Sequence, residues 1–119
     1  MSAVQLRADF DLIAGWVQPG ERVLDLGCGD GALLRRLIDE RGALGYGVEL
    51  EDAAVLAAIA NGINVIQGNL EQGLAGFDDQ TFNHVVLSRT LQTVRHTENI
   101  LAEMLRVGSE AVVSFPNFD

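Results

Sequence analysis

The residues best suited to ligand chemistry lie in the segment Gly27-Cys28-Gly29-Asp30-Gly31 and in its acidic surroundings. Glycine tolerates positive φ angles and lets a ligand approach the backbone with no Cβ in the way. A helix that begins directly after such a segment presents N–H groups and partial positive charge to an anionic group of a ligand. Another acid, Asp25, lies two residues before Gly27. The pattern predicts a binding site for a nucleotide-like molecule.

The acids in this segment favour one class of ligand over another. With Ala32 in the last place, the segment also fits the dinucleotide fingerprint G-x-G-x-x-G/A. Asp25 and Asp30 would, however, repel a pyrophosphate by roughly a few kcal/mol at ~4 Å. A ligand with an ammonium, a sulfonium and a single carboxylate fits two acids better. We therefore expect S-adenosylmethionine, or its demethylated product S-adenosylhomocysteine, rather than NAD.

Further candidate residues follow two other β-rich stretches. Glu49 lies 24 residues after Asp25, where an acid can accept hydrogen bonds from both ribose hydroxyls. Leu50 would cover one face of the adenine, and the Asn69 amide could pair with the adenine edge. The alternatives are a solvated acid before a helix for Glu49 and a turn residue for Asn69. The candidate cofactor-binding residues are Asp25, Gly27, Cys28, Gly29, Gly31, Glu49, Leu50, Asn69, Leu70 and Ser88.

The elements that must position these residues alternate between short β-rich runs and longer helical patterns. Strands are expected at 22–26, 44–50, 63–66, 82–88 and 110–115, and helices at 3–17, 31–41, 52–61 and 97–107. Residues 71–81 are expected to be mostly loop, with room for one helical turn. This alternation predicts an α/β fold: a three-layer αβα sandwich with a Rossmann-like, doubly wound and mostly parallel sheet. Ligands of such sheets bind outside the carboxyl ends of the strands.

Composition narrows the class of protein. The 119 residues predict a single domain over 1–119, and 48% apolar residues suffice for a core. A net charge of −9 argues against nucleic-acid partners. The longest apolar run, Ala53–Ala60, is too short to span a membrane, and the N-terminus does not resemble a signal peptide, so a cytoplasmic location is expected. With one cysteine and two well-separated histidines, no metal site is expected.

No residue offers an evident catalytic group. Cys28 has no paired base and is interpreted as a small apolar filler. His84, in the middle of a strand, is interpreted as a packed, hydrogen-bonded histidine. Methyl transfer from a sulfonium depends largely on positioning the acceptor, so the lack of a base leaves an enzymatic role open. The catalytic residues therefore stay unassigned.

Several motifs resemble those of class I S-adenosylmethionine-dependent methyltransferases. VLDLGCGDG (Val23–Gly31) resembles the first motif, and YGVEL (Tyr46–Leu50), GNL (Gly68–Leu70) and FNHVVLS (Phe82–Ser88) resemble the next three in order. The resemblance implies a strand order of 3-2-1-4-5, with the family's final antiparallel hairpin missing after Asp119. Asn69 stands where the family often has Asp.

The segment Leu87–Phe118 resembles more narrowly the MetW family of methionine biosynthesis proteins. Gln92-Thr93 and Val107-Gly108-Ser109 replace the Glu-His pair and the Lys-Pro-Gly-Gly turn of ordinary class I enzymes. The resemblance implies a partner or activator of the homoserine O-acyltransferase MetX rather than methyl transfer. A methyltransferase acting on a small molecule is the alternative.

The surface that contacts a partner is expected after strands four and five. The residues assigned to it are Arg89, Gln92, Arg95 and His96. A second copy of the chain is a further candidate partner, because the last strand would leave an exposed edge.

Overall fold

The computed structural model describes residues 3–88 and 97–114. The helices are α1 (Ala3–Trp16), α2 (Ala32–Arg41), α3 (Asp52–Ala60), α4 (Leu70–Gly73) and α5 (Thr97–Val107). The strands are β1 (Arg22–Leu26), β2 (Leu44–Glu49), β3 (Asn64–Gln67), β4 (Phe82–Ser88) and β5 (Gly108–Ser114). No helix in this part of the chain is long and apolar enough to cross a membrane.

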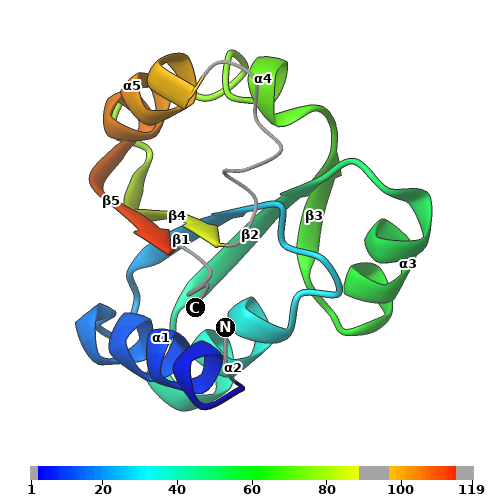
Figure 1. Cartoon of the computed structure of the whole chain (residues 1–119), viewed down its shortest axis with the longest axis vertical. Helices are drawn as coiled ribbons and strands as arrows, with labels where there is room; N and C mark the ends of the chain where they lie inside the picture. Colours follow the sequence, from blue (N-terminus) through cyan, green and yellow to red (C-terminus); the bar gives the residue numbers. More distant parts are fainter. Residues whose placement is uncertain (1–2, 89–96, 115–119) are drawn as a thin grey trace.

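The five strands form one parallel sheet in the order β3-β2-β1-β4-β5. Helices α1 and α2 lie on one side of the sheet, and α4 and α5 lie on the other (Figure 1). The predicted three-layer fold and strand order are therefore confirmed. Parallel strands need helical crossovers, which place helices on both faces and leave the strands covered.

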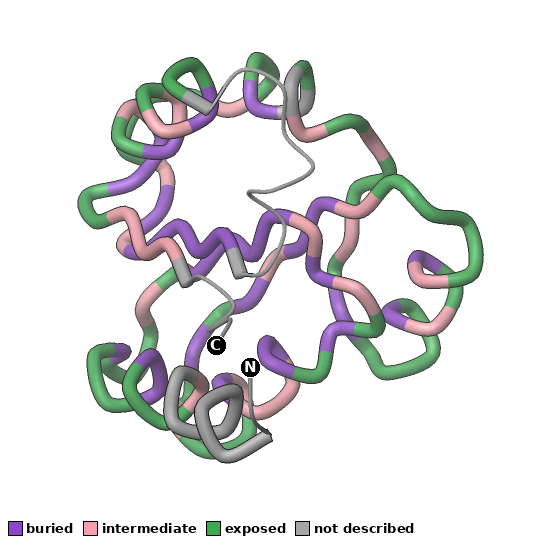
Figure 2. The backbone as a smooth tube through the Cα atoms, viewed as in Figure 1, coloured by how far each residue is buried: buried purple, intermediate pink, exposed green. Residues whose placement is uncertain are grey.

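Two apolar clusters fill the space between the layers. One joins Val23 and Val86 of the sheet to Ile13, Leu34 and Ala58 of the first three helices. The other packs alternate strand residues against α4 and α5; its fully buried members include Leu24, Val48, Val85, Leu87 and Met104. Buried residues follow the strands and the helix surfaces that face them (Figure 2). The apolar strand runs of the sequence are explained by this two-sided covering.

The ends of the elements differ slightly from the prediction. Helix α2 begins at Ala32 because Gly31 adopts a left-handed φ of 80°, and β3 begins one residue late, at Asn64. The largest difference is in β5, which begins at Gly108 directly after α5 instead of at 110. The Gln80 side chain explains it, because its amide donates to the carbonyl oxygens of Leu105, Arg106 and Gly108 and satisfies the helix end without a turn.

Candidate functional site

The register of the sheet brings the predicted site residues to one edge. Leu26 pairs with Val48 of β2 and with Leu87 of β4, and Glu49 pairs with Gln67 of β3. The segments that follow β1, β2 and β3 therefore emerge side by side at the carboxyl ends of the strands. The Gly68 N–H, which donates to the Glu49 carbonyl oxygen at 2.9 Å, ties two of these segments together.

The glycine segment between β1 and α2 is held by hydrogen bonds within the chain. The N–H groups of Gly27 and Cys28 both donate to the Val48 carbonyl oxygen, at 2.8 and 3.2 Å. Gly29 and Gly31 have φ angles of 59° and 80°, which only glycine adopts readily. At Gly31 a Cβ would also lie 2.6 Å from the Ile63 side chain. The segment therefore needs glycine for its conformation and for its packing.

The start of α2 differs from the expected anion site. The Ala32 N–H, expected to face an anionic group, donates instead to the Asp30 carboxylate at 3.0 Å. The Gly29 N–H likewise donates to the Glu49 carboxylate. Because carboxylates of the chain already accept from these N–H groups, a pyrophosphate would have to displace them. This geometry weighs against a dinucleotide ligand.

Glu49 connects the glycine segment to the turn after β2. Its Oε1 accepts from the Gly29 N–H at 2.8 Å, and its Oε2 accepts from the N–H groups of Leu50 and Glu51 at 3.0 and 3.1 Å. A carboxylate offers about four lone-pair positions, so three are occupied in this conformation. Glu49 can accept one further hydrogen bond here, and to accept from both ribose hydroxyls it must release one N–H group.

A hollow of about 230 Å³ lies beside the glycine segment. It is lined by Phe10, Asp25, Gly27, Cys28, Asp30, Ala32 and Leu33. Asp25 is only 3% exposed, so the wall of the hollow contains a buried carboxylate. Two acids around a small hollow are suited to a cationic group such as an ammonium.

Cys28 is buried in the glycine segment and packs against β2. A Cβ added at Gly47 would lie 2.5 Å from its Sγ, so the thiol occupies the space that Gly47 leaves. Burial raises the pKa of the Cys28 thiol to about 12, and the nearby charges of Asp25 and Glu49 act in the same direction. The thiol is therefore protonated at neutral pH, which agrees with its interpretation as an apolar filler.

His84 likewise has the predicted packed and hydrogen-bonded environment. It is 7% exposed, and its Nε2 lies 2.9 Å from Glu21 Oε1. Its Nδ1 faces Glu110 Oε1 at 3.7 Å. In the register of the sheet His84 pairs with Val23, at the start of β1, so it lies away from the carboxyl ends of the strands.

Two residues near the site were not identified from the sequence. Phe10 of α1 lines the hollow, and it lies too far from the glycine segment in sequence for any spacing to indicate it. Gln67, at the end of β3, donates from its amide to the Leu50 carbonyl oxygen at 3.0 Å and also to Asp52. A polar residue at the end of a strand is the signal that could have found Gln67.

The remaining predicted residues are placed as follows. Leu50 is 60% exposed, and Asn69 is exposed while its carbonyl oxygen accepts from the Gln72 N–H at 3.0 Å. Ser88 ends β4, and its side chain lies outside the described part. The predicted partner residues Arg89, Gln92, Arg95 and His96 also lie outside the described residues. The ligand-binding role of each site residue stays a prediction.

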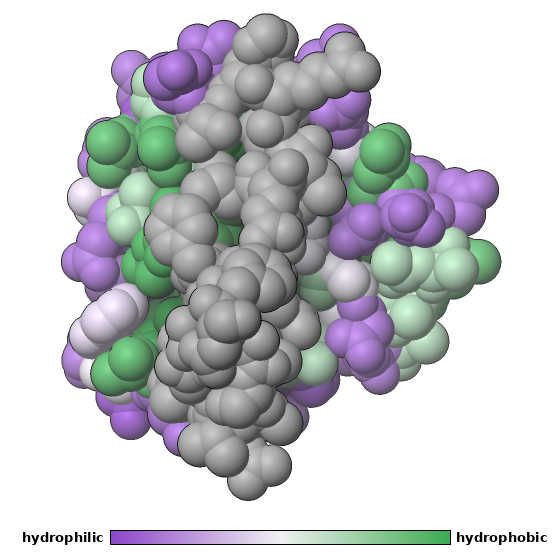
Figure 3. All heavy atoms as spheres, in the orientation of Figure 1, coloured by the Kyte–Doolittle hydropathy of each residue, from purple (hydrophilic) through white to green (hydrophobic). Residues whose placement is uncertain are grey.

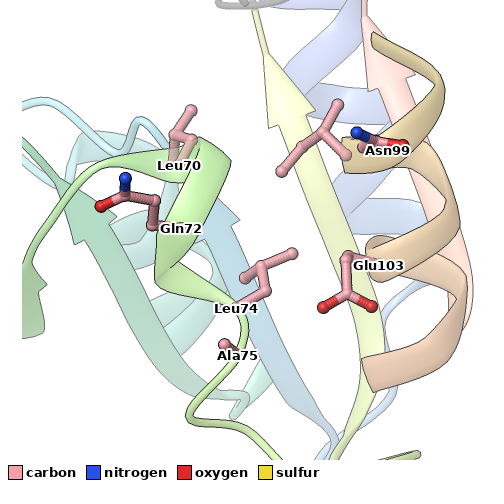
Figure 4. Close-up of a pocket in the computed structure, with 7 residues that line it drawn as sticks. Leu70, Gln72, Leu74, Ala75, Asn99 and Glu103 are labelled. Carbon is pink, nitrogen blue, oxygen red and sulfur yellow. The ribbon is translucent and has the colours of Figure 1, made fainter. Parts of the chain in front are cut away.

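A second, smaller hollow of about 130 Å³ lies between α4 and α5 on the opposite face of the sheet. Leu70 and Leu74 line it on one side and Asn99 and Glu103 of α5 line it on the other, and Leu74 points toward α5 (Figure 4). Arg106 already holds the Glu103 carboxylate, with Nε 2.7 Å from Oε2. Because Arg106 already pairs with the one charged residue among the described side chains that line it, this hollow is less suited to a charged cofactor than the one beside Asp25. Among the described residues no cluster of His, Cys, Asp or Glu could hold a metal ion.

Comparison with known proteins gives a family and a fold. The family model "Methionine biosynthesis protein MetW" matches residues 7–119. The bifunctional methionine biosynthesis protein MetXA/MetW of Rhodopirellula baltica is 41% identical over 125 residues, covering 98% of this chain and 20% of that protein. The ubiquinone/menaquinone biosynthesis C-methyltransferase UbiE of Ectopseudomonas mendocina is 30% identical over 108 residues, covering 82% of this chain and 41% of that protein.

Solved structures agree on the fold. A phosphoethanolamine N-methyltransferase of Haemonchus contortus, in complex with phosphomonomethylethanolamine and S-adenosylhomocysteine, superposes with a TM-score of 0.76 at 19% identity. The match covers 87% of this chain and 26% of that chain. The chain thus spans less than half the length of these relatives.

Proposed function

Because the chain belongs to the MetW family of methionine biosynthesis proteins, we propose that it binds S-adenosylmethionine or S-adenosylhomocysteine and acts as a partner of a homoserine O-acyltransferase. The ligand would lie at the carboxyl ends of β1, β2 and β3. The proposed cofactor-binding residues are Asp25, Gly27, Cys28, Gly29, Gly31, Glu49, Leu50, Asn69, Leu70 and Ser88.

One observation gives the strongest support to this ligand. The glycine segment is surrounded by carboxylates that already accept hydrogen bonds from its N–H groups. Glu49 accepts from Gly29, and Asp30 accepts from Ala32. A polyanionic ligand would compete with both acids, whereas a ligand with cationic groups and ribose hydroxyls complements them. Asp25 would lie near the ligand's ammonium group, and Glu49 would accept from the ribose.

The ligand assignment is tested by calorimetry with S-adenosylhomocysteine and with NAD. Glu49→Ala should weaken S-adenosylhomocysteine binding by about 1.5–3 kcal/mol, since it removes a charge-assisted hydrogen bond. Glu51→Ala is the matched control, because Glu51 is exposed and lies two residues away. Tighter binding of NAD, or equal affinity of the Glu49→Ala variant, would refute the assignment.

The partner assignment is supported by the bifunctional MetXA/MetW relative, which joins both names in one protein. We expect this chain to co-purify with a homoserine O-acyltransferase and to raise its activity. The chain also offers no evident acceptor-activating group among its described residues, since the thiol of Cys28 is protonated and His84 lies away from the site.

A methyltransferase acting on a small molecule is the second candidate function. Its support is the 30% identity to a C-methyltransferase and the shared fold. A screen for transfer of a radiolabelled methyl group to cell metabolites separates the two candidates. Labelling of one metabolite, with no effect on the acyltransferase, would favour the methyltransferase.

A further inference from the structure

Leu50 is an exposed hydrophobic residue whose backbone is held from both sides by other residues' side chains. Its own side chain is 60% exposed. Its N–H donates to Glu49 Oε2 at 3.0 Å, and its carbonyl oxygen accepts from the Gln67 amide at 3.0 Å. A leucine fixed in this way presents an apolar surface of defined position at the carboxyl ends of β2 and β3.

Other hydrophobic residues are exposed on the same side of the molecule. The surface over α3 shows hydrophobic atoms between hydrophilic ones (Figure 3). Leu56 and Ile59, which are 67% and 56% exposed, lie within α3, whose backbone is held by its own helical hydrogen bonds. Because single exposed hydrophobic residues are common, exposure alone does not indicate a contact. Leu50 differs in its place, since it lies directly after Glu49, the residue that we propose for the ribose.

The Gln67 side chain is directed to the Leu50 turn by the sheet and by α3. Gln67 is the last residue of β3 and pairs with Glu49 of β2 in the parallel register. Its amide nitrogen donates to the Leu50 carbonyl oxygen and also to the carboxylate of Asp52, the first residue of α3. An amide nitrogen has two N–H groups, and two acceptors are provided for it here. The amide is therefore oriented toward Leu50 by its second partner.

We propose that Gln67 is a positioning residue for the adenine of the ligand, because it holds the backbone of the leucine that covers one adenine face. This inference rests on the proposed function for the identity of the ligand. A purine has a flat apolar face, and a leucine whose backbone is already ordered loses less conformational freedom on contact with it. Glu49 holds the same turn at the Leu50 N–H, so the ribose contact and the adenine contact share one support.

The test measures the affinity for S-adenosylhomocysteine by calorimetry. Gln67→Met keeps a side chain of similar length but removes the amide, and it should weaken binding about threefold to tenfold, the effect of a single hydrogen bond. Asn64→Leu is the matched control and should bind normally, because Asn64 carries an exposed amide at the other end of β3. Thermal melting checks that both variants are folded at the temperature of the measurement.

A double-mutant cycle separates positioning from a purely structural role. Leu50→Ala removes the apolar surface and should itself weaken binding. Because Gln67 acts through Leu50, adding Gln67→Met to Leu50→Ala should cost little further affinity. If the two losses multiplied in the double variant, Gln67 would support the site by another route, and the proposal would be overturned.

Two further results distinguish this inference from the proposed function. If the unmodified chain binds S-adenosylhomocysteine and Gln67→Met binds it equally well, the positioning role is wrong while the proposed ligand stands. If the unmodified chain does not bind S-adenosylhomocysteine at all, the proposed ligand is wrong, and the positioning role fails with it.

Discussion

The ribose contact proposed for Glu49 would draw on the same oxygen atoms that already accept hydrogen bonds within the chain. In this conformation its carboxylate orders the glycine segment through Gly29 and the turn after β2 through Leu50 and Glu51. The proposed ribose contact needs two acceptor positions, and about one is left. Ligand binding at this residue would therefore exchange a hydrogen bond within the chain for one to the ligand. A change of Glu49 would then disturb both the glycine segment and the proposed ligand contact.

Cys28 provides a prediction about reactivity at the same scale. The thiol has a pKa of about 12 in the folded chain, so it is protonated at pH 8 and lacks the thiolate that reacts with alkylating agents. We expect iodoacetamide at pH 8 to leave Cys28 unmodified in the folded protein and to label it fully in denaturant, as measured by mass spectrometry. Rapid labelling of the folded protein would contradict the buried, non-nucleophilic role.

Whole elements could be predicted from the sequence more reliably than their contacts. The strands ending at Leu26, Glu49 and Ser88 were located because apolar runs end at glycine or polar residues. The start of β5 was missed because Gly108-Ser109 resembles a turn, whereas the distant Gln80 caps α5 and makes a turn unnecessary. The partners of Glu49 could not be predicted either, since they depend on the conformation of the glycine segment. Local patterns reveal elements, and long-range hydrogen bonds decide their ends.

Arg106 links α5 to the segment that precedes β4. Its guanidinium donates to the carbonyl oxygens of Leu74 and Phe77 at 2.8 and 2.9 Å, and it pairs with Asp79 and Glu103. Arg106→Met should lower the free energy of unfolding, because partly buried carbonyl groups lose their donors. Arg36→Met is the control and should lower the free energy of unfolding less, because its ion pairs with Asp11 and Glu40 lie at the surface. If urea denaturation showed the same loss of unfolding free energy for Arg106→Met and Arg36→Met, this role of Arg106 would be contradicted.

The hydrogen bonds of Glu21 predict how the free energy of unfolding depends on pH. The Gln18 N–H and then the hydrogen bond to His84 lower the pKa of the Glu21 carboxyl below its ordinary value of 4.5. The folded state therefore binds this proton less readily than the unfolded state, so the contribution is present above pH 4.5 and is lost as the pH falls through the lowered pKa. Glu21→Gln should lower stability at neutral pH and reduce the loss on acidification, as measured by urea denaturation across the acidic range. If the Glu21→Gln variant lost as much stability on acidification as the unmodified protein, this role of Glu21 would be contradicted.

At the scale of the whole molecule, the candidate ligand site and the exposed side of α3 lie at neighbouring parts of one edge of the sheet. The carboxyl ends of β1 and β2 hold the acids and glycines, and α3 continues from them with an exposed apolar side. The positive charges of the described chain lie outside the stretch from β2 to β4. The acids and glycines at this edge are suited to the ligand that we propose.

The most direct test of the central proposal is the initial rate of homoserine acylation by a homoserine O-acyltransferase, measured with and without this chain. We expect the rate to rise as the chain is added and to level off once the two proteins form a complex. An unchanged rate at every concentration of the chain would contradict the proposed role as a partner of the acyltransferase.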